Sequence, residues 1–541
     1  MNYKDIKLVI LTAGKASRLY PLTLGFPKCL LSVNQKPEVF NMITPMIKKG
    51  LRDITFVVNL ENKVLVESFI NHSFECLDLE VKYIVQEDFN GPAAAFKLIE
   101  NDLDKPVMLL LGDTLCEIPT NLDRSWLGVS EVLSEKNRFC MVDYNNSFEI
   151  TEFIDKSDEE MNTNYAAIGI YYLHNYKLLK EVFKRDLPKI HNEYQLSSLF
   201  LEYMKDEKMY VEKFNEWEDI GTLDAYREVT EKKFNCRYFN SLYLDSNNVL
   251  TKKSSYEKIK AEMEWFRQNK DNDFGRLVPR FYDYGNDAMQ YGIEYYDYLT
   301  LMEYFCYYPL NEYSIKVIFS KLFNTMVDIY KSTKKVIPEF NNYTRNILLK
   351  KTVCRLYDWD RKDLLSLDKV IINDKEYLGV LSCLEKLKSS IEKICDNSKD
   401  FISVIHGDPA FSNILFSPRT QIFRFIDPRG NFDIDTIYGD TRYDIAKLRH
   451  CYHGRYDEVI NDMFVVEEKN HSISYSFFKN IDYSIYDEVV SKDYDINDIE
   501  LIEGLLFISM LPLHSDYPER QKVFFAKGLE CLNNQINRRG L

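Results

Sequence analysis

The sequence lacks several features that would each assign it to a broad class of protein. Its 541 residues contain no run of about 18 apolar residues, so we expect no membrane span. None of the 11 cysteines belongs to a C-x-x-C pair, which favours reduced thiols and argues against a zinc site. Basic residues are in deficit, and the net charge of −15 argues against a nucleic-acid binder. The N-terminal MNYKDIKLVIL is no signal peptide, so we expect a cytoplasmic protein.

The length of the chain and its changing pattern predict two α/β domains. A chain of 541 residues exceeds one ordinary core. Strand-like and helical segments alternate over residues 1–115, which predicts a doubly wound, mainly parallel sheet within a domain spanning 1–235. From about residue 236 the pattern changes to a hairpin, a helix at 256–269 and mostly amphipathic helix over 314–394, which we assign to a second domain, 236–541.

The segment L-T-A-G-K-A-S-R, residues 11–18, leaves a strand and has the composition of a phosphate-binding loop. Its small residues allow the backbone to approach phosphate oxygens, and Ser17 adds a hydroxyl. Arg18 and, further on, Lys28 can neutralise the charge on a transferring phosphoryl group. Taken alone, however, such a loop is also a common structural turn.

Two aspartates far apart in the sequence are candidate ligands of Mg²⁺. Asp113 ends the apolar run VMLLLGD, and Asp219 lies in the turn of NEWEDIGT. Carboxylates together with phosphate oxygens are ligands that Mg²⁺ prefers, and a pair of them suits metal-assisted phosphoryl transfer. Asp113 alone could equally cap the segment that follows it.

The stretch L-T-A-G-K-A-S-R-L-x-P-L-T-x-x-x-P-K resembles the signature of the sugar-phosphate nucleotidylyltransferases, over residues 5–230. Ala16 stands where that family usually has a second glycine. The resemblance implies catalytic roles for Arg18 and Lys28, and Mg²⁺ at Asp113 and Asp219. It implies contacts to the nucleoside triphosphate, with CTP or UTP expected, from Ala13, Gly14, Ser17, Gln86 and Gly91. The acceptor would meet Lys156, in a softened E-K-P motif, and Glu193.

The implied reaction needs no side-chain nucleophile. An oxygen of the sugar phosphate attacks the α-phosphorus of the triphosphate in line, and pyrophosphate leaves. The attacking phosphate is already ionised, so catalysis consists of positioning and charge neutralisation.

A second constellation begins with HGDPAFSN, which fits the H-x-D-x-x-x-x-N spacing of a kinase catalytic loop. Asp408 would accept the proton of a substrate hydroxyl, and Asn413 would bind Mg²⁺ together with Asp427, which ends the apolar run FRFI. Lys252 or Lys253 ends a predicted strand, and the next helix carries glutamates. A lysine and a glutamate so placed can clamp ATP phosphates, although each is also common on solvated surfaces.

Residues 238–541 resemble the aminoglycoside-phosphotransferase and choline-kinase superfamily, most specifically around 403–450. The resemblance implies a bilobal, protein-kinase-like fold with a small N-lobe, about 236–305, and a helical C-lobe, about 306–541. It implies Lys252 and Glu262 as the ATP clamp and Asp408 as the catalytic base. The motifs I-D-P-R-G and G-D-T-R-Y-D-I-A-K-L look like a branch from capsule and surface-polysaccharide pathways, in which Asp440 and Asp444 tie the loop down.

Together the two halves predict a bifunctional enzyme that uses Mg²⁺. ATP would phosphorylate a small alcohol or sugar, and a nucleotidyl group would then join the phosphate, giving an NDP-sugar or CDP-alcohol for surface glycan synthesis. One alternative is a choline or ethanolamine kinase with the matching cytidylyltransferase, since Tyr295, Tyr296 and Tyr298 could surround a quaternary ammonium. A second alternative is one active half with the other a regulatory binding module. A homo-oligomer is left open.

Overall fold

The computed structural model describes residues 2–155, 163–190, 192–232, 240–285, 289–430 and 437–541. The chain divides into two compact units, Met1–Phe234 and Asn235–Leu541. The boundary expected near residue 235 falls in the stretch 233–239, outside the described residues. Each unit is described by itself below.

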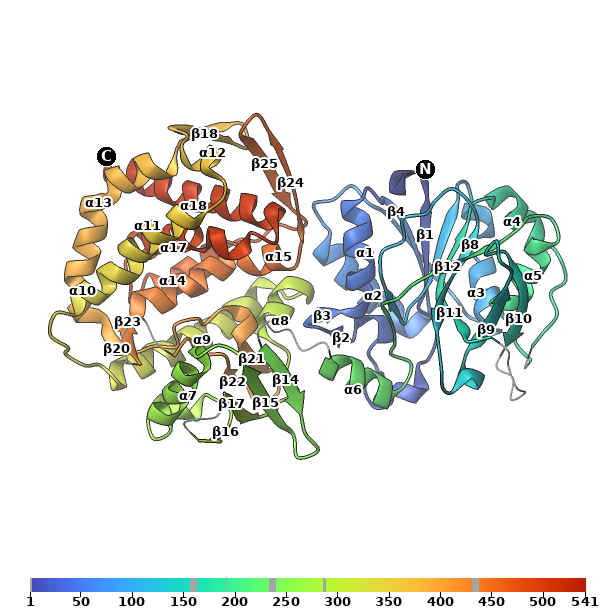
Figure 1. Ribbon diagram of the computed structural model, residues 1–541, viewed down its shortest axis with the longest axis horizontal. Helices are drawn as coiled ribbons and strands as arrows, with labels where there is room; N and C mark the ends of the chain where they lie inside the picture. Colours follow the sequence, from blue (N-terminus) through green and yellow to red (C-terminus); the bar gives the residue numbers. More distant parts are fainter. Residues whose placement is uncertain (1, 156–162, 191, 233–239, 286–288, 431–436) are drawn as a thin grey trace. The chain divides into compact units, whose positions relative to one another are not determined.

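A nine-stranded sheet forms the centre of the N-terminal unit (Figure 1). Its parallel part has the order β6-β1-β4-β5, and the strands are β1 (Lys7–Leu11), β4 (Asp53–Val58), β5 (Glu80–Val85) and β6 (Val107–Leu111). β1 and β4 are runs of apolar residues buried along almost their whole length, as expected for strands covered on both faces. The strands and order of this part confirm the predicted α/β fold.

The other part of the sheet is largely antiparallel, so the sheet is mixed rather than mainly parallel. The central strand β11 (Tyr165–Leu173) runs antiparallel to β6, β8 and β9. The remaining strands are β8 (Trp126–Glu131), β9 (Cys140–Tyr144), β10 (Ile150–Asp155) and β12 (Tyr210–Lys213). The prediction missed this because an apolar run such as AAIGIYYL shows that a strand exists but not which direction its neighbours take.

Helices cover both faces of this sheet (Figure 1). The helices are α1 (Glu38–Lys48), α2 (Leu60–Ser73), α3 (Pro92–Lys97), α4 (Tyr176–Val182), α5 (Leu196–Met204) and α6 (Leu223–Lys232). α2 begins where the Asn59 side chain accepts a hydrogen bond from the amide of Asn62. Core residues such as Phe96, Leu179 and Leu199 pack α3, α4 and α5 against Val9 and Leu109 of the strands.

The C-terminal unit begins with a four-stranded sheet of order β14-β15-β17-β16 and a helix, α7 (Lys258–Asn269). The strands are β14 (Asn240–Leu244), β15 (Val249–Ser254), β16 (Phe281–Tyr282) and β17 (Gln290–Glu294). β14 and β15 form the antiparallel hairpin that the sequence predicts, and Asn248 takes the left-handed backbone its turn requires. The predicted helix 256–269 is also confirmed, beginning two residues later.

Most of the remaining chain is helical (Figure 1). The larger helices are α8 (Leu301–Tyr307), α9 (Glu312–Ser332), α11 (Lys351–Asp358), α13 (Val380–Asp396), α14 (Thr441–Tyr452), α16 (Ser484–Val490), α17 (Ile496–Met510) and α18 (Pro518–Arg539). One hairpin, β18 (Lys369–Ile372) and β19 (Lys375–Leu378), interrupts the region predicted to be mostly helix. Its turn residues Asn373 and Asp374 both have positive φ, which is the geometry of a tight hairpin turn.

Two absences hold for the described part of the chain. No helix there is both long and apolar enough to cross a bilayer. The described cysteines form no disulfide with one another.

Candidate active sites

A cavity of about 220 Å³ lies in the N-terminal unit at the carboxyl ends of β1 and β6. Arg18, Asp113 and Asp219, all predicted from the sequence, line it. Other polar or charged lining residues are Thr114, Arg138, Asp155, Gln195 and Ser197. The location agrees with the rule that ligands of α/β sheets bind beyond the carboxyl ends of the strands.

The pairing of two short strands makes Asp113 and Asp219 neighbours. Asp113 directly precedes β7 (Thr114–Cys116), which runs antiparallel to β13 (Trp217–Asp219), and Asp219 lies opposite Thr114. Both carboxylates face the same cavity. Two hard oxygen donors in such an arrangement fit Mg²⁺.

Each of these carboxylates also meets a cation. The Lys28 ammonium lies 2.7 Å from Oδ2 of Asp113. The Arg138 guanidinium lies 2.9 Å from Oδ2 of Asp219. Lys28 begins a 3₁₀ turn after Pro27, which directs it toward the site. Asp113 and Asp219, the two predicted metal ligands, are therefore each paired with a cation of the protein.

The predicted phosphate loop follows β1. Asn59 donates a hydrogen bond to the carbonyl of Ala13 (3.0 Å), which fixes the first part of the loop. Ala16 has φ 46° and ψ 40°, in the left-handed region, and directly precedes the 3₁₀ turn of Ser17 and Arg18. A left-handed backbone costs a residue with a Cβ about 1 kcal/mol, which explains why the resembling family uses glycine at this position. A Cβ on Gly14 would meet nothing within 4 Å, so the space beside it is open.

The predicted base-reading residues lie where β5 ends and α3 begins. Gln86 is buried and donates a hydrogen bond to the carbonyl of Asp88 (3.0 Å). Gly91 has φ 99°, and a Cβ there would come within 2.6 Å of the carbonyl oxygen of Tyr194. Gly91 is therefore required to be glycine for steric reasons alone. Neither residue lines the cavity itself, although the next residue, Pro92, does.

Of the two residues predicted to bind the acceptor, only Glu193 lies in the described part of the chain. Glu193 is exposed and accepts a hydrogen bond from the side chain of Gln195 (3.1 Å), which lines the cavity. Glu193 thus contacts the lining rather than forming part of it. Lys156 lies outside the described residues.

The polar lining residues that were not predicted as site residues are Thr114, Arg138, Asp155, Gln195 and Ser197. Asp155 accepts a hydrogen bond from Ser197 (2.6 Å), and Arg138 pairs with Asp219. Asp155 had a signal, because it is the acid of the altered E-K-P motif. Arg138 and Ser197 had no such signal in the sequence, because only the tertiary structure brings them to the cavity.

In the C-terminal unit, Lys252 on β15 makes the predicted pair with Glu262 on α7, at 2.7 Å. The same ammonium also forms an ion pair with Asp427. Tyr291, opposite Lys252 in the β15–β17 ladder, donates a hydrogen bond to Glu262 (3.2 Å). Burial raises the pKa of Glu262 above its ordinary value, although Lys252 opposes this effect. The geometry thus selects Lys252 over Lys253 as the partner of Glu262.

The HGDPAFSN loop follows β20 (Ile402–Val404) and is held from outside by α14. Asp444 of α14 accepts hydrogen bonds from the amides of His406 and Gly407, each 2.8 Å long. Asn413 closes the loop by donating its side-chain amide to the carbonyl of Asp408 (3.0 Å). These contacts agree with the expectation that Asp444 ties the loop down.

Asp427 lies beside this loop. The amide of Ile426, the residue before it, donates to the carbonyl of Asn413 (3.0 Å). Asp427 itself has φ 57°, a backbone strain of the kind that clusters at functional sites. Through Lys252 and Ile426, the loop, Asp427 and the β15–α7 pair form one connected network.

Lys447, on the same face of α14 as Asp444, was not predicted. Its ammonium lies 3.0 Å from Oδ1 of Asp408. Burial alone would raise the pKa of Asp408, but the Lys447 ammonium lowers it to about 2. Asp408 is therefore ionised at neutral pH.

His406 has a structural environment. It is fully buried, with the rings of Trp265, Phe274 and Phe425 about 6 Å away. Burial lowers its pKa to about 4, so it is neutral at physiological pH. Besides this packing, its Nδ1 accepts a hydrogen bond from the amide of Asp408 (3.4 Å), so His406 also supports the backbone of the H-G-D motif.

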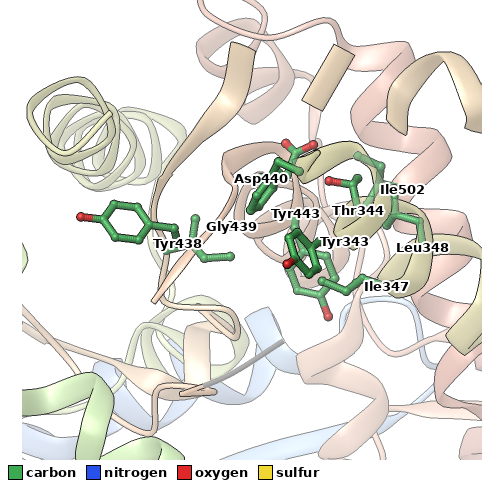
Figure 2. Close-up of a pocket in the computed structure, with 11 residues that line it drawn as sticks. Tyr343, Thr344, Ile347, Leu348, Tyr438, Gly439, Asp440, Tyr443 and Ile502 are labelled. Atoms are coloured by element: carbon green, nitrogen blue, oxygen red, sulfur yellow. The ribbon is translucent and has the colours of Figure 1, made fainter. Parts of the chain in front are cut away.

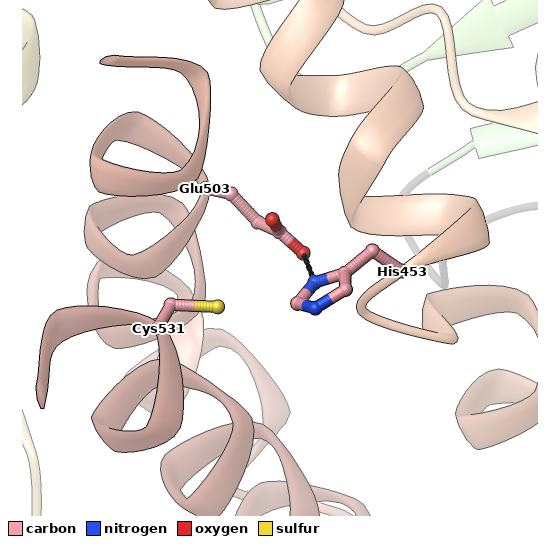
Figure 3. A group of neighbouring side chains, drawn as sticks. All are labelled: His453, Glu503 and Cys531. Carbon is pink, nitrogen blue, oxygen red and sulfur yellow. Dashed lines mark hydrogen bonds and ion pairs between the residues drawn. The ribbon is translucent and has the colours of Figure 1, made fainter. Parts of the chain in front are cut away.

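Two other features of the C-terminal unit have the outward form of a site. Figure 2 shows an apolar cavity beside Tyr343, Thr344 and Tyr443, but its volume is about 20 Å³, too small for a nucleotide or a sugar. Figure 3 shows His453, Glu503 and Cys531 within ligand distance of one another. The Arg449 guanidinium already pairs with Glu503, which makes this cluster a buried ion-pair network rather than a metal site.

Tyr296 and Tyr298, two of the tyrosines named for a quaternary ammonium cage, lie beside one another. The rings of Tyr296 and Tyr298 lie 5.3 Å apart. The Arg424 guanidinium already lies 5.3 Å from the Tyr296 ring. A cation of the protein thus already lies against one of the three rings named for the cage.

Comparison with known proteins decides the nature of the N-terminal unit. Residues 7–235 match the family model described as nucleotidyl transferase. The N-terminal unit is a nucleotidyltransferase domain. A glucose-1-phosphate thymidylyltransferase of Neisseria meningitidis is 23% identical over 51% of this chain and 99% of its own length. A mannose-1-phosphate guanyltransferase of Schizosaccharomyces pombe is 26% identical over 46% of this chain and 69% of its own.

Solved structures are also similar to part of the chain. A crystal structure of a glucose-1-phosphate thymidylyltransferase from Bacillus anthracis has 23% identity and a TM-score of 0.39, covering 43% of this chain and 97% of its own. A UDP-glucose pyrophosphorylase complexed with UDP-glucose has 20% identity and a TM-score of 0.37, covering 41% of this chain and 96% of its own.

Proposed function

We propose that the cavity of the N-terminal unit is the site at which a nucleotidyl group is joined to a sugar phosphate. The observation that carries this proposal is the meeting of Asp113, Asp219 and Arg18 in one cavity, from segments far apart in the sequence. Arg18 and Lys28 neutralise charge on the triphosphate. Asp113 and Asp219 hold Mg²⁺, which supplies further neutralisation of phosphate charge when bound.

The reaction transfers one nucleotidyl group, so that one bond to the α-phosphorus forms and one breaks. An oxygen of the sugar phosphate attacks the α-phosphorus, the bond from that phosphorus to the bridging oxygen breaks, and pyrophosphate carries away the electron pair. No proton needs to move, since both phosphates are ionised. Gln86 and Gly91 contribute to binding the base, CTP or UTP being the proposed donor, and Lys156 and Glu193 serve the acceptor.

The test uses the full-length chain with MgCl₂ and each of CTP, UTP, dTTP and GTP, together with glucose 1-phosphate or mannose 1-phosphate. Pyrophosphate release and the mass of the nucleotide sugar are measured. Asp219→Asn is expected to lower the rate about 100-fold, because a neutral amide holds Mg²⁺ more weakly. Asp206→Asn, which alters a carboxylate outside the cavity lining, is the control. Equal rates in wild type and Asp219→Asn would refute the site.

We also propose that the C-terminal unit phosphorylates a small alcohol or sugar with ATP and Mg²⁺. Its support is the connected network in which Lys252 meets both Glu262 and Asp427, beside a loop that carries Asp408 and Asn413. Asp408 accepts the hydroxyl proton, Lys252 contacts ATP phosphates, and Asn413 and Asp427 bind the metal. A phosphate ester made here is the class of acceptor that the N-terminal unit consumes, for building a surface glycan.

A panel of hexoses, polyols, choline and ethanolamine tests this proposal. Alcohol-dependent formation of ADP is measured for the wild type and for Asp408→Asn. A sugar or polyol is the expected substrate, and phosphorylation of choline or ethanolamine alone would favour the cytidylyltransferase alternative. Absence of alcohol-dependent ADP formation across the panel would favour a regulatory role for this unit.

A further inference from the structure

Arg138 is a cation of the N-terminal cavity to which no role has been given. It ends the 3₁₀ turn Lys136–Arg138 between β8 and β9. One side of its guanidinium meets Glu135, and the other lies 2.9 Å from Asp219. Its side chain is 32% exposed and lines the cavity together with Arg18.

Arg138 forms an ion pair with Asp219, which is also a proposed ligand of the metal. In the described residues Asp219 pairs with Arg138 and Asp113 pairs with Lys28, so the two acids have one cation each. A divalent cation held by these carboxylates would bring two further positive charges to the same place. Because like charges repel at this range, the metal would weaken the attraction between Asp219 and the guanidinium.

The released guanidinium would lie near Asp155, the acid of the altered E-K-P motif. Cys140, two residues after Arg138, lies opposite Asp155 in the β9–β10 ladder. Asp155 and its hydrogen-bond partner Ser197 both line the cavity. The ring of Phe139 lies 5.4 Å from the guanidinium and supports it from one side.

Arginine is suited to exchange one anion for another. Its planar fork matches carboxylate and phosphate oxygens equally well, and it stays charged throughout. A lysine has the charge without the fork.

We propose that Arg138 is an exchangeable cation, which holds Asp219 while the metal is absent and binds the phosphate of the acceptor once the metal has taken Asp219. This inference rests on the proposed role of Asp219 as a metal ligand. It adds a phosphate-binding residue for the sugar phosphate and makes metal binding a condition for acceptor binding.

The test compares Arg138→Met and Arg138→Lys with the wild-type full-length chain. Mn²⁺ binding without nucleotide is measured by electron paramagnetic resonance, and KM by pyrophosphate release with glucose 1-phosphate and the preferred nucleotide. Arg138→Met is expected to bind Mn²⁺ about 3- to 10-fold more tightly, because one partly exposed competing ion pair is gone. Its KM for the sugar phosphate is expected to rise about tenfold or more, with that for the nucleotide within about twofold. Arg138→Lys is expected to restore part of both changes.

Arg185→Met is a matched control. Arg185 is also 32% exposed and pairs with Asp206 at 2.5 Å, but it does not line the cavity. It should change neither Mn²⁺ binding nor either KM. A purely structural role of Arg138 would not tighten metal binding.

Two results would overturn the inference: unchanged or weaker Mn²⁺ binding by Arg138→Met, or a rise in the KM of the nucleotide instead of the sugar phosphate. Failure of the underlying function looks different. If Asp219→Asn bound Mn²⁺ as tightly as the wild type, the metal site itself would be refuted, whatever Arg138 does.

Discussion

The two units hold the carboxylates of their candidate sites by different structural means. In the N-terminal unit Asp113 and Asp219 meet because β7 and β13 pair in one register. In the C-terminal unit Asp408 lies in a loop whose backbone is fixed by Asp444 of α14. The first site therefore depends on strand pairing between distant segments, and the second on one helix.

The cations that balance these carboxylates also differ between the units. Lys252 and Lys447 of the C-terminal unit are 12% and 17% exposed, and Lys28 of the N-terminal unit is 13% exposed. Arg138, at 32%, is the most exposed of the four. Buried cations are permanent parts of a site, because moving them leaves a charge unpaired. An exposed cation can change partner at low cost, which is the property that exchange at Asp219 requires.

The largest expected effect comes from Lys28→Ala, which should remove the activity of the N-terminal unit and leave that of the C-terminal unit. Pyrophosphate release should fall about 1,000-fold, since a cation directed at the reacting phosphates is lost. Alcohol-dependent ADP formation should be unchanged. Lys184→Ala, at an exposed lysine of the same unit, is the control. Loss of both activities would mean that the units share a site or that the chain is unfolded.

Asp408→Asn should have the opposite effect, removing the activity of the C-terminal unit and leaving that of the N-terminal unit. ADP formation should fall about 100- to 1,000-fold, because the amide cannot accept the hydroxyl proton. Nucleotide-sugar formation from an added sugar phosphate should be unaffected. Asp462→Asn, in the same unit and paired with Arg520, is the control. If Asp408→Asn formed ADP at the wild-type rate, the assignment of the loop would be wrong.

Glu262→Gln should have a smaller effect, limited to ATP binding. It removes one of the two carboxylates that hold Lys252 and leaves Asp427. The expected result is a KM for ATP raised about tenfold with little change in kcat, measured by ADP formation. Glu264→Gln, on the exposed side of the same helix, is the control. A fall in kcat with unchanged KM would contradict the proposed clamp.

The smallest effect concerns the pH dependence of stability. Because burial lowers the pKa of His406 to about 4, the unfolded chain binds a proton below about pH 6.5 that the folded chain does not. Stability therefore falls as the pH falls through this range, by about 2 kcal/mol between pH 7.5 and 5. Urea unfolding of wild type and His406→Gln at both pH values isolates this contribution. An equal change in both proteins would contradict it.

Site residues could be predicted from the sequence where they belong to one contiguous motif. The loop after β1, its glycine and the lysine after Pro27 form a contiguous motif, so their sequence order is informative. Ala16 was noticed as a departure, but only the structure shows that its backbone is left-handed. The H-G-D loop and the Lys252–Glu262 pair were found in the same way, from spacing.

The residues that were missed act through the fold. Arg138 reaches Asp219, and Lys447 reaches Asp408, across turns and helices that no short motif encodes. The antiparallel direction of β11 and the β18–β19 hairpin were missed because strand pairing is set by tertiary contacts. In both units, therefore, the sequence predicts the acids better than the cations that balance them.

The most direct measurement is nucleotide-sugar formation by the wild type and by Asp113→Asn and Asp219→Asn, from an NTP and a sugar 1-phosphate with MgCl₂. The account predicts a nucleotide sugar and pyrophosphate in equal amounts from the wild type, and a loss of about 100-fold in each variant. Wild-type rates in either variant, or no nucleotide sugar from any of the four nucleotides, would contradict it.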